Sequence, residues 1–122
     1  MVKTKSAYDP VEKPDGQRFL VARFWPRGLS KAKLSLTAWL RELAPGKELL
    51  KAWKAGQISW TGYELRYREE MSGRHEEIDR LAGKAAHGTI TLLCFEKEGD
   101  PCCHRHLLKE MIEAGKLPRS ST

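Results

Sequence analysis

The sequence lacks the long apolar run that a membrane-spanning helix needs. Such a helix takes ~20 consecutive, mainly apolar residues, whereas charged residues make up 31% of this chain and interrupt each hydrophobic stretch early. The first residues, Met-Val-Lys-Thr-Lys, also lack the apolar region of a signal peptide. We therefore expect a protein that neither spans a membrane nor carries a secretion signal.

Cysteine is scarce too. The chain has three cysteines, an odd number, and Cys102 and Cys103 are adjacent. A disulfide framework uses an even number of separated cysteines, so we expect free thiols, as in a reducing cytoplasm. Repeats, linkers and low-complexity tracts are absent from the sequence as well, and 122 residues suffice for one domain with a core. The prediction is a single cytoplasmic domain over residues 1–122, with 116–122 as a frayed tail.

Positive charge, in contrast, is abundant and unevenly spread. The net charge is +6. Residues 1–54 hold 12 Lys and Arg against 5 Asp and Glu, whereas residues 55–122 hold 10 against 11. A basic half favours anionic partners such as nucleotides or nucleic acid. Lysines on helix faces are more often simply solvated, so charge alone does not choose a function.

Three segments have the composition of strands. Residues 89–95 form a short β-branched and apolar run, which is typical of a strand covered on both faces in a parallel sheet. Residues 18–24 form a second such run and lead into a Trp-Pro-Arg-Gly loop at residues 25–28. Residues 2–8 alternate weakly and predict an edge strand.

Four helical segments lie between the predicted strands at residues 18–24 and 89–95. Ser35 is the expected cap of the first, with apolar residues up to position 43, and Ser59 is the expected cap of the third. The second covers residues 47–55, and the fourth has its apolar face at positions 78 to 85. The order strand, strand, helices, strand, helix predicts a small single-domain α/β fold. Its sheet should be mainly parallel, with about three strands flanked by helices.

The strand at residues 89–95 and the helix after it contain the expected functional site. Asp100 followed by Pro101 is typical of an N-cap and a first helical position. Cys102 and Cys103 would then be the second and third helical residues. Backbone N–H groups are unpaired there and the helix dipole is positive, which stabilises anions and thiolates. Parallel α/β sheets also place ligands at this edge.

These positions predict a site for an anionic or nucleotide-like small molecule. Arg27 follows the second strand and Arg105 lies just inside the last helix, so both reach the same edge if the strands are parallel. Arg27, Arg105 and the backbone at Cys102 would hold the anion. Cys103 would act as a nucleophile or redox thiol, and His104 as an acid or base. Consecutive helical residues point about 100° apart, so no direct Cys103–His104 pair is expected. The sequence does not predict a cofactor.

Three further candidates lie near that edge: Glu96, Lys97 and Trp25. Glu96 and Lys97 follow the strand directly, although a charged loop is the commoner reason for such a pair. Trp25 is expected to pack under its loop more than to touch a ligand.

The sequence leaves other interpretations open. Cys103 and His104 also extend the apolar face of the predicted helix, and cysteine is often simply a small buried hydrophobe. The basic first half would suit a non-catalytic module that binds nucleic acid. A metal site would draw on Cys94, Cys102, Cys103, His104 and His106. Structural zinc sites combine ligand pairs from two places, and the sequence shows one cluster, so no metal is expected. A Cys94–Cys103 disulfide has no better support.

Several motifs together resemble the YeaO-like proteins, the domain of unknown function 488. They are Tyr8-Asp9-Pro10, Asp15-Gly16, Trp25-Pro26-Arg27-Gly28 within a run from Val21 to Leu29, Trp39-Leu40, Glu42-Leu43-Ala44-Pro45, Leu49, Arg66-Tyr67 and Thr91-Leu92-Leu93. Some members carry a C-x-E-K…C-H-R pattern, which Cys94, Glu96, Lys97, Cys103, His104 and Arg105 resemble. Other members lack these cysteines, so a thiol is not essential to what the whole family shares. The resemblance implies a soluble bacterial or archaeal α/β protein and supplies no activity.

Overall fold

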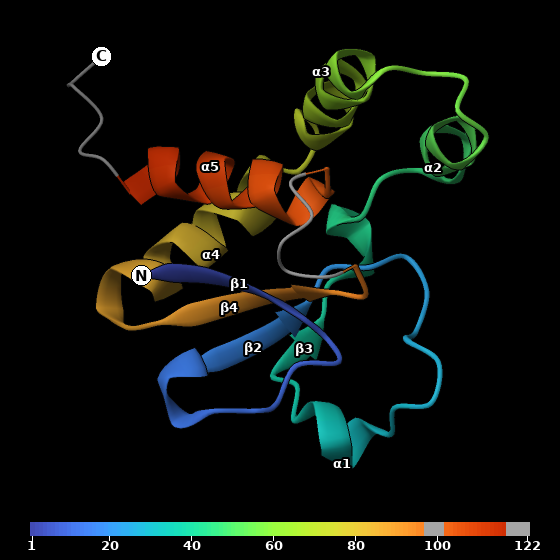
Figure 1. Ribbon diagram of the computed structural model, residues 1–122. Coiled ribbons are helices and arrows are strands. Elements are labelled where there is room, and N and C mark those ends of the chain that lie inside the picture. The colour runs from blue at the N-terminus through green and yellow to red at the C-terminus, as the bar shows by residue number, and fades with distance from the viewer. Residues whose placement is uncertain (97–101, 117–122) are drawn as a thin grey trace, which may run out of the picture.

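The structure, a computed structural model, describes residues 1–96 and 102–116, and its elements are labelled in Figure 1. In chain order they are β1 (Val2–Ser6), η1 (Lys13–Asp15), β2 (Gln17–Leu20), α1 (Lys31–Leu34), β3 (Ala38–Trp39), η2 (Arg41–Leu43), α2 (Lys47–Lys54), α3 (Trp60–Met71), α4 (His75–His87), β4 (Ile90–Cys94) and α5 (His104–Lys116). Among the helices of these two ranges, none is long and apolar enough to cross a membrane.

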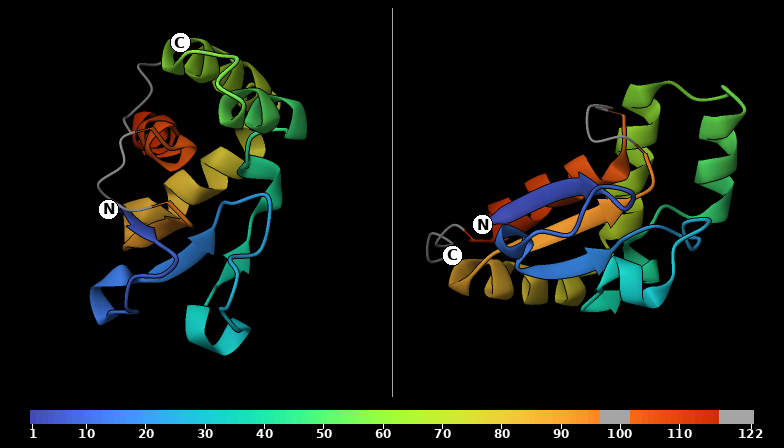
Figure 2. Two further views of the ribbon diagram at one scale, coloured as in Figure 1. Left: turned by 45° about the vertical axis from the view of Figure 1, so that its right-hand side comes forward. Right: turned by 60° about the horizontal axis from the view of Figure 1, so that its bottom comes forward.

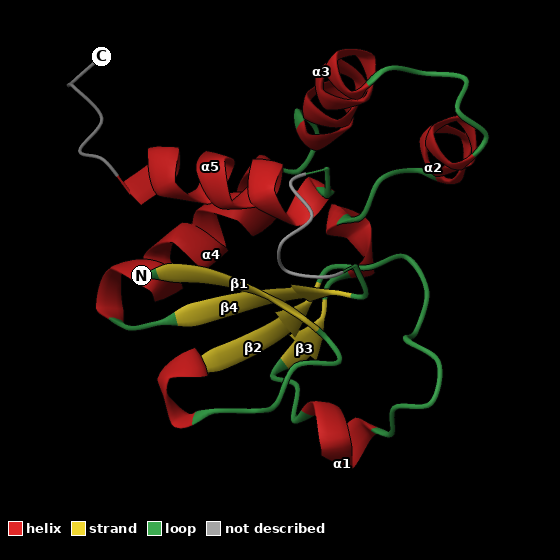
Figure 3. Cartoon of the chain, viewed as in Figure 1, coloured by secondary structure: helices red, strands yellow, loops and turns green. Residues whose placement is uncertain are grey.

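The strands form one parallel sheet in the order β1-β4-β2-β3 (Figure 3). The predicted small parallel α/β fold is therefore confirmed, with four strands in place of about three. β4 lies in the interior, where Ile90 pairs with Val2 on one side and with Gln17 on the other. All five of its residues are buried, which explains why its sequence is a continuous apolar run without alternation.

Helices and loops bury both faces of the sheet. α4 and α5 pack against each other and against the sheet, α5 along β1 and β4 (Figures 1 and 2). Phe19 and Leu92 belong to the core cluster that contains these helices. Their neighbours Leu20 and Leu93 belong to a second cluster under the α1 loop, because successive strand side chains point to opposite faces.

The helix predicted to start at Ser35 is wrong. Ser35 has a left-handed backbone, with φ of 49°, and it ends the short helix α1. The chain then forms β3, where Leu40 N–H donates to the carbonyl of Leu20 at 2.8 Å. The Leu and Trp spacing over residues 36–43 fits a helix, but pairing with the open edge of β2 satisfies the backbone and decides the outcome.

Two strands and three helices lie close to their predicted positions. β1 is an edge strand, and β2 is shorter than the predicted run of residues 18–24, although Val21 N–H still donates to the carbonyl of Leu93 at 2.9 Å. The helices α2, α3 and α4 form where expected, and Ser59 caps α3 by accepting from Gly62 N–H at 3.1 Å.

The last helix starts later than predicted. α5 begins at His104, so Cys102 and Cys103 precede it and do not occupy its second and third positions. The carbonyl of Cys103 accepts from His106 N–H at 3.1 Å, which fixes Cys103 at the boundary. The predicted cap, Asp100-Pro101, lies outside the described residues. α5 runs to Lys116, the last of the described residues.

Candidate functional site

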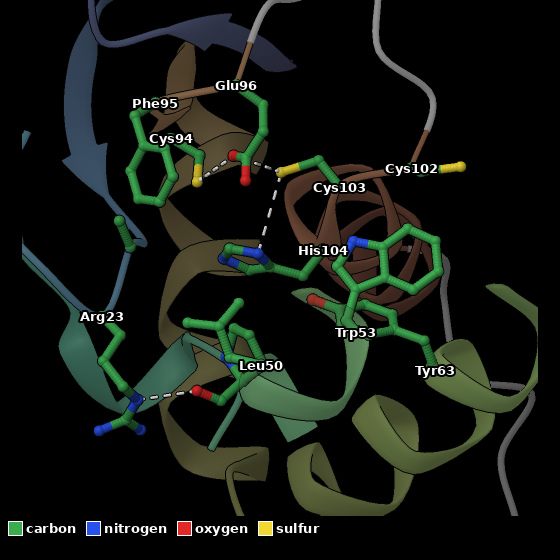
Figure 4. A pocket seen from close by; sticks show the side chains of 12 residues that line it. Arg23, Leu50, Trp53, Tyr63, Cys94, Phe95, Glu96, Cys102, Cys103 and His104 are labelled. Atoms are coloured by element: carbon green, nitrogen blue, oxygen red, sulfur yellow. Dashed lines mark hydrogen bonds between the residues drawn. The ribbon is translucent and has the colours of Figure 1, made fainter. Parts of the chain in front are cut away.

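The end of β4 and the start of α5 meet at the carboxyl edge of the sheet. Cys94 is the last residue of β4, Glu96 follows two positions later, and Cys103 and His104 lie at the beginning of α5 (Figure 4). Two segments separated along the chain thus bring four side chains with reactive atoms into one cluster. This is the edge at which parallel α/β sheets carry their ligand sites.

The reactive atoms of these four side chains are in contact. Glu96 Oε2 lies 2.9 Å from Cys94 Sγ and 3.4 Å from Cys103 Sγ. Cys103 Sγ lies 3.9 Å from His104 Nδ1. The two sulfurs and one ring nitrogen of His104 all lie within 4.8 Å of one another. Cys94, Cys103 and His104 are only 1%, 3% and 5% exposed, so water screens little of their interaction.

The contact between Cys103 and His104 corrects the expectation that adjacent residues would point apart. That expectation assumed that both residues are helical. Because α5 begins at His104, the 100° rotation between helical neighbours does not govern the Cys103 side chain. The sulfur is free to lie beside the ring of the next residue.

The His104 ring is held from its other side. Its Nε2 lies 2.6 Å from the carbonyl oxygen of Val21. A carbonyl only accepts, so Nε2 carries the proton in this contact, and Nδ1 of the neutral ring faces Cys103 as an acceptor. The Tyr67 ring packs against the imidazole with centroids 5.6 Å apart. The geometry therefore fixes both the orientation and the tautomer of a base beside a thiol.

The two buried thiols are not equivalent. A hydrogen bond from Cys94 lowers the pKa of Cys103; burial opposes this shift, while His104 and the backbone N–H of Arg105 reinforce it. The same hydrogen bond, together with burial, raises the pKa of Cys94. Cys103 is thus the more acidic thiol of the pair. Burial alone would lower the pKa of His104, but the hydrogen bond with Cys103 and its charge outweigh burial and raise this pKa.

The pKa of Glu96, the carboxyl group of the cluster, is shifted as well. Burial and the negative charge of Cys103 raise the pKa of its carboxyl group. Its Oε2 lies between the two sulfurs and accepts hydrogen bonds from both thiols. Glu96, a further candidate from the sequence, therefore lies in direct contact with both thiols.

A small cavity of about 20 Å³ adjoins the cluster, which is room for roughly one water molecule. Its lining is Ala22, Arg23, Pro45, Leu50, Trp53, Tyr63, Cys94, Phe95, Glu96, Cys102, Cys103 and His104. Sequence reasoning missed Arg23, Trp53 and Tyr63, whose spacing indicates only strand or helix core. Cys102 lines this cavity, but Figure 4 shows its sulfur turned away from the cluster.

Arg105 does not line the cavity. Its side chain is fully buried, and Nη1 donates to the backbone carbonyl of Glu96 at 2.9 Å. The guanidinium therefore fixes the turn after β4 and brings a buried positive charge close to the cluster.

Arg27 lines a neighbouring hollow of about 410 Å³, together with Tyr8, Phe24, Trp25, Pro26, Lys54 and Phe95. Phe95 belongs to both linings, so the hollow and the cysteine cavity adjoin at this ring. Arg27 and Arg105 are thus not brought into one cavity. Trp25 donates from Nε1 to the carbonyl of Leu29 at 2.6 Å and packs edge-on against Trp39. Lys97 lies outside the described residues.

Part of the positive charge of the first half is internal. Lys5 and Arg18 both bind the buried carboxylate of Asp15. The exposed lysines of α2, in contrast, form a row at Lys47, Lys51 and Lys54 beside the half-exposed Phe24. This row borders the hollow that contains Arg27, because Lys54 lines both.

The fold and the cluster define a small parallel α/β protein with a thiol–imidazole–carboxyl site at its sheet edge. The chain belongs to the DUF488 family of YeaO-like proteins: the family model DUF488-N3a, described as "Active DUF488-N3 subclade", matches residues 2–116. Membership predicted from the motifs is therefore confirmed.

Two relatives illustrate the range of similarity. The uncharacterized protein YeaO of Escherichia coli (strain K12) is 38% identical over 96 residues, which cover 79% of this chain and 84% of the relative. An uncharacterized protein of Mycobacterium tuberculosis (strain ATCC 25618 / H37Rv) is 30% identical over 92 residues, which cover 74% and 78%. No solved structure is a significant match.

Proposed function

We propose that the protein is a cysteine-dependent enzyme that acts on an anionic, nucleotide-like small molecule, with Cys103 as nucleophile and His104 as its base. One observation carries the proposal. His104 presents Nδ1 to the Cys103 sulfur at 3.9 Å while its Nε2 is bonded to Val21. Nucleophile, base and a group that orients the base are the three parts of an activated nucleophile. Hydrogen bonds of this kind are often long before a substrate binds.

The chemistry that this arrangement supports is substitution through a covalent intermediate. The Cys103 proton moves to His104 Nδ1, and the thiolate attacks an electrophilic atom of the substrate. A bond from sulfur to that atom forms, and the bond to the leaving group breaks with its electron pair. The leaving group takes the proton from His104. Water then attacks the sulfur-bound group and gives one proton to His104. The bond from sulfur to that group breaks with its electron pair on sulfur, and the thiolate takes the proton from His104, which restores the thiol. The net reaction consumes one water molecule.

The hollow beside Phe95 supports an anionic ligand. Arg27 and Lys54 contribute two cations, and none of the described residues that line the hollow is acidic. Phe24 and Tyr8 are each 51% exposed at its wall. Cations beside exposed aromatic faces suit a molecule that joins a phosphate or carboxylate to a planar ring. The adjoining cavity holds only about one water, so Phe95 has to shift for such a ligand to reach Cys103.

Alkylation kinetics test the nucleophile. Protein from which a chelator has removed any bound metal is treated with iodoacetamide near pH 7, and labelling is followed by intact mass. Two variants separate the adjacent thiols: Cys102→Ser retains Cys103, and Cys103→Ser retains Cys102. We expect Cys102→Ser to be labelled faster than a peptide thiol, and to stay reactive at acidic pH where a peptide thiol does not, because the pKa of Cys103 is lowered. Labelling of Cys103 no faster than the peptide would refute the proposal.

A second candidate is a non-catalytic module that binds nucleic acid. The row of Lys47, Lys51 and Lys54 next to Phe24 favours it, because such surfaces combine phosphate contacts with base stacking. Binding of a fluorescent single-stranded oligonucleotide would then fall steeply with salt, and Lys51→Ala would reduce the salt slope by roughly one unit. The exposed Lys33→Ala is the matched control. Equal salt slopes for both variants would contradict this candidate.

A further inference from the structure

Three potential metal ligands, Cys94, Cys103 and His104, lie within 4.8 Å of one another at the carboxyl edge of the sheet, and Glu96 contacts both sulfurs. We propose that Cys94, Cys103 and His104 bind one divalent ion of the zinc class, with Glu96 as the fourth ligand. The bound ion would block Cys103. Metal binding stands on the geometry of the cluster alone, whereas its role as an inhibitor rests on the proposed enzymatic function.

The spacing of the ligand atoms suits a tetrahedral ion. Zn²⁺ binds thiolate sulfur at ~2.3 Å and imidazole nitrogen at ~2.0 Å, so neighbouring ligand atoms lie about 3.3–3.8 Å apart. Glu96 Oε2 lies 2.9 Å from Cys94 Sγ and 3.4 Å from Cys103 Sγ, and Cys103 Sγ lies 3.9 Å from His104 Nδ1. All separations among the two sulfurs and the histidine nitrogen are at most 4.8 Å, so shifts of up to about 1 Å, within reach of side-chain rotations, would bring these atoms to zinc geometry.

The ligands come from two separate places, as in known structural sites. Cys94 and Glu96 form a C-x-E pair at the end of β4, and Cys103 and His104 form an adjacent pair at the start of α5. From the sequence only the second cluster was apparent, because Cys94 was assigned to the strand core. Folding moves Cys94 to the second cluster and supplies the missing pair.

The surroundings also match a metal centre. A ligating histidine almost always donates its other ring N–H to a carbonyl or carboxylate, and His104 Nε2 lies 2.6 Å from the carbonyl of Val21. Two thiolates, a carboxylate and a divalent cation leave one net negative charge. The buried Arg105 guanidinium, bonded to the carbonyl of Glu96, offsets it.

The donor set selects the class of ion. Two thiolates and an imidazole favour Zn²⁺ and similar ions, whereas Mg²⁺ and Ca²⁺ require oxygen ligands. Coordination to zinc engages one electron pair of the thiolate, neutralises much of its charge and so lowers its nucleophilicity. Binding would therefore slow the reactions of Cys103, oxidation included, until a chelator or a competing protein withdraws the ion.

Metal binding is measured directly on the full-length protein. Metal-free protein is dialysed against Zn²⁺ or Co²⁺, and bound metal is counted by elemental analysis. We expect one ion per chain, and a Co²⁺ spectrum with thiolate charge-transfer and tetrahedral d–d bands. Cys94→Ser should bind at least about 100-fold more weakly, because it loses a direct ligand. Cys102→Ser, the matched control, should bind like the parent. Substoichiometric binding by the parent, or equal affinities of the two variants, would overturn the proposal.

Alkylation of the same preparations separates this inference from the proposed enzyme. Zinc should protect Cys103 in the Cys102→Ser protein, and a chelator should restore its labelling. Cys94→Ser retains His104 beside Cys103 and a hydroxyl donor, so it should be labelled with or without zinc. Fast labelling without stoichiometric metal would overturn the metal site and leave the enzyme standing. Tight tetrahedral Co²⁺ binding, together with slow labelling of the protein after a chelator has removed the metal, would support the metal site and overturn the proposed enzyme.

Discussion

His104 Nε2 lies 2.6 Å from the carbonyl oxygen of Val21, although 83 positions separate the two residues. This contact ties the first turn of α5 to the chain just beyond β2. It leaves the thiol-facing nitrogen of the ring as an acceptor. The reactivity of Cys103 should therefore depend on a residue outside its own loop.

Replacement of His104 should slow alkylation of Cys103. His104→Gln loses the base and the positive charge that help to lower the pKa of Cys103. We expect the rate near pH 7 to fall by on the order of tenfold or more. Near pH 9 a larger share of Cys103 is ionised in the variant as well as in the parent, so the labelling rates of the two proteins should converge. A rate deficit that is the same at all pH values would indicate a structural effect instead. His75→Gln, exposed on α4, is the control.

Gly16 should not tolerate a side chain. Its φ is 62°, and a Cβ there would lie 2.1 Å from the carbonyl oxygen of Thr89. That carbonyl also accepts the N–H of Gln17 at 3.0 Å, so it cannot move without loss of a bond between β2 and the start of β4. Gly16→Ala should lower the free energy of unfolding by about 3 kcal/mol or more.

Gly28→Ala is a matched control for this steric effect. Gly28 also has a positive φ, 80°, but no atom of the described residues lies within 4 Å of its would-be Cβ. It should cost only the left-handed penalty, about 1 kcal/mol. Urea denaturation of both variants gives the comparison, and equal losses would show that the contact with Thr89 does not matter.

The strands and most helices could be predicted because local pattern and tertiary position agree. β4 is apolar throughout because neighbours cover both its faces, and Tyr63, Tyr67 and Met71 form one buried stripe of α3. The helix predicted over residues 36–43 is wrong because the spacing of their apolar side chains fits both a helix and a strand. Only the free edge of β2 decides in favour of β3, and that edge is a property of the whole sheet.

The candidate site could be located but not assembled from the sequence. Strand order puts Cys94 and Cys103 at one edge, which the pattern indicated. Their contact with Glu96, and that of Cys103 with His104, depends on where α5 begins, which a proline-based cap predicted too early. Arg23 and Trp53 line the cavity through packing between elements, and no local motif encodes that.

Acid should destabilise the protein through Asp15. Burial on its own raises the pKa of this carboxyl, but hydrogen bonds from the backbone of Glu12 and from Lys5 and Arg18 outweigh it and lower the pKa below its ordinary value. A pKa that is lowered in the folded state stabilises that state at pH values above the ordinary pKa of the carboxyl. This contribution is lost as the pH falls through the folded pKa. The free energy of unfolding should therefore decline below about pH 4.

Asp15→Asn tests this assignment. It leaves Lys5 and Arg18 without a buried counter-charge, so it should cost about 3 kcal/mol at pH 7. It should also flatten the acid limb of a plot of unfolding free energy against pH. Glu76→Gln, whose ion pair with Arg80 is exposed, should leave both the value and the slope almost unchanged. A persistent acid limb in Asp15→Asn would assign the transition to other carboxyls.

The hollow that contains Arg27 should prefer an anion that carries a planar ring. Arg27 and Lys54 would hold the anionic group, and the exposed face of Phe24 would cover the ring. Isothermal titration with adenosine monophosphate and with inorganic phosphate compares the two contributions. Arg27→Ala should weaken nucleotide binding by about 10- to 150-fold, since a charged hydrogen bond is worth ~1.5–3 kcal/mol.

Phe24→Ala should bring nucleotide binding down to the level of phosphate. Lys33→Ala, on α1, should change the affinity for neither ligand. If adenosine monophosphate binds no better than phosphate to the parent protein, the aromatic wall contributes nothing and the ligand class is wrong. If Arg27→Ala and Lys33→Ala weaken binding equally, the attraction is a general effect of the basic surface. Unequal losses would place the anion in this hollow, next to the Phe95 ring that separates it from Cys103.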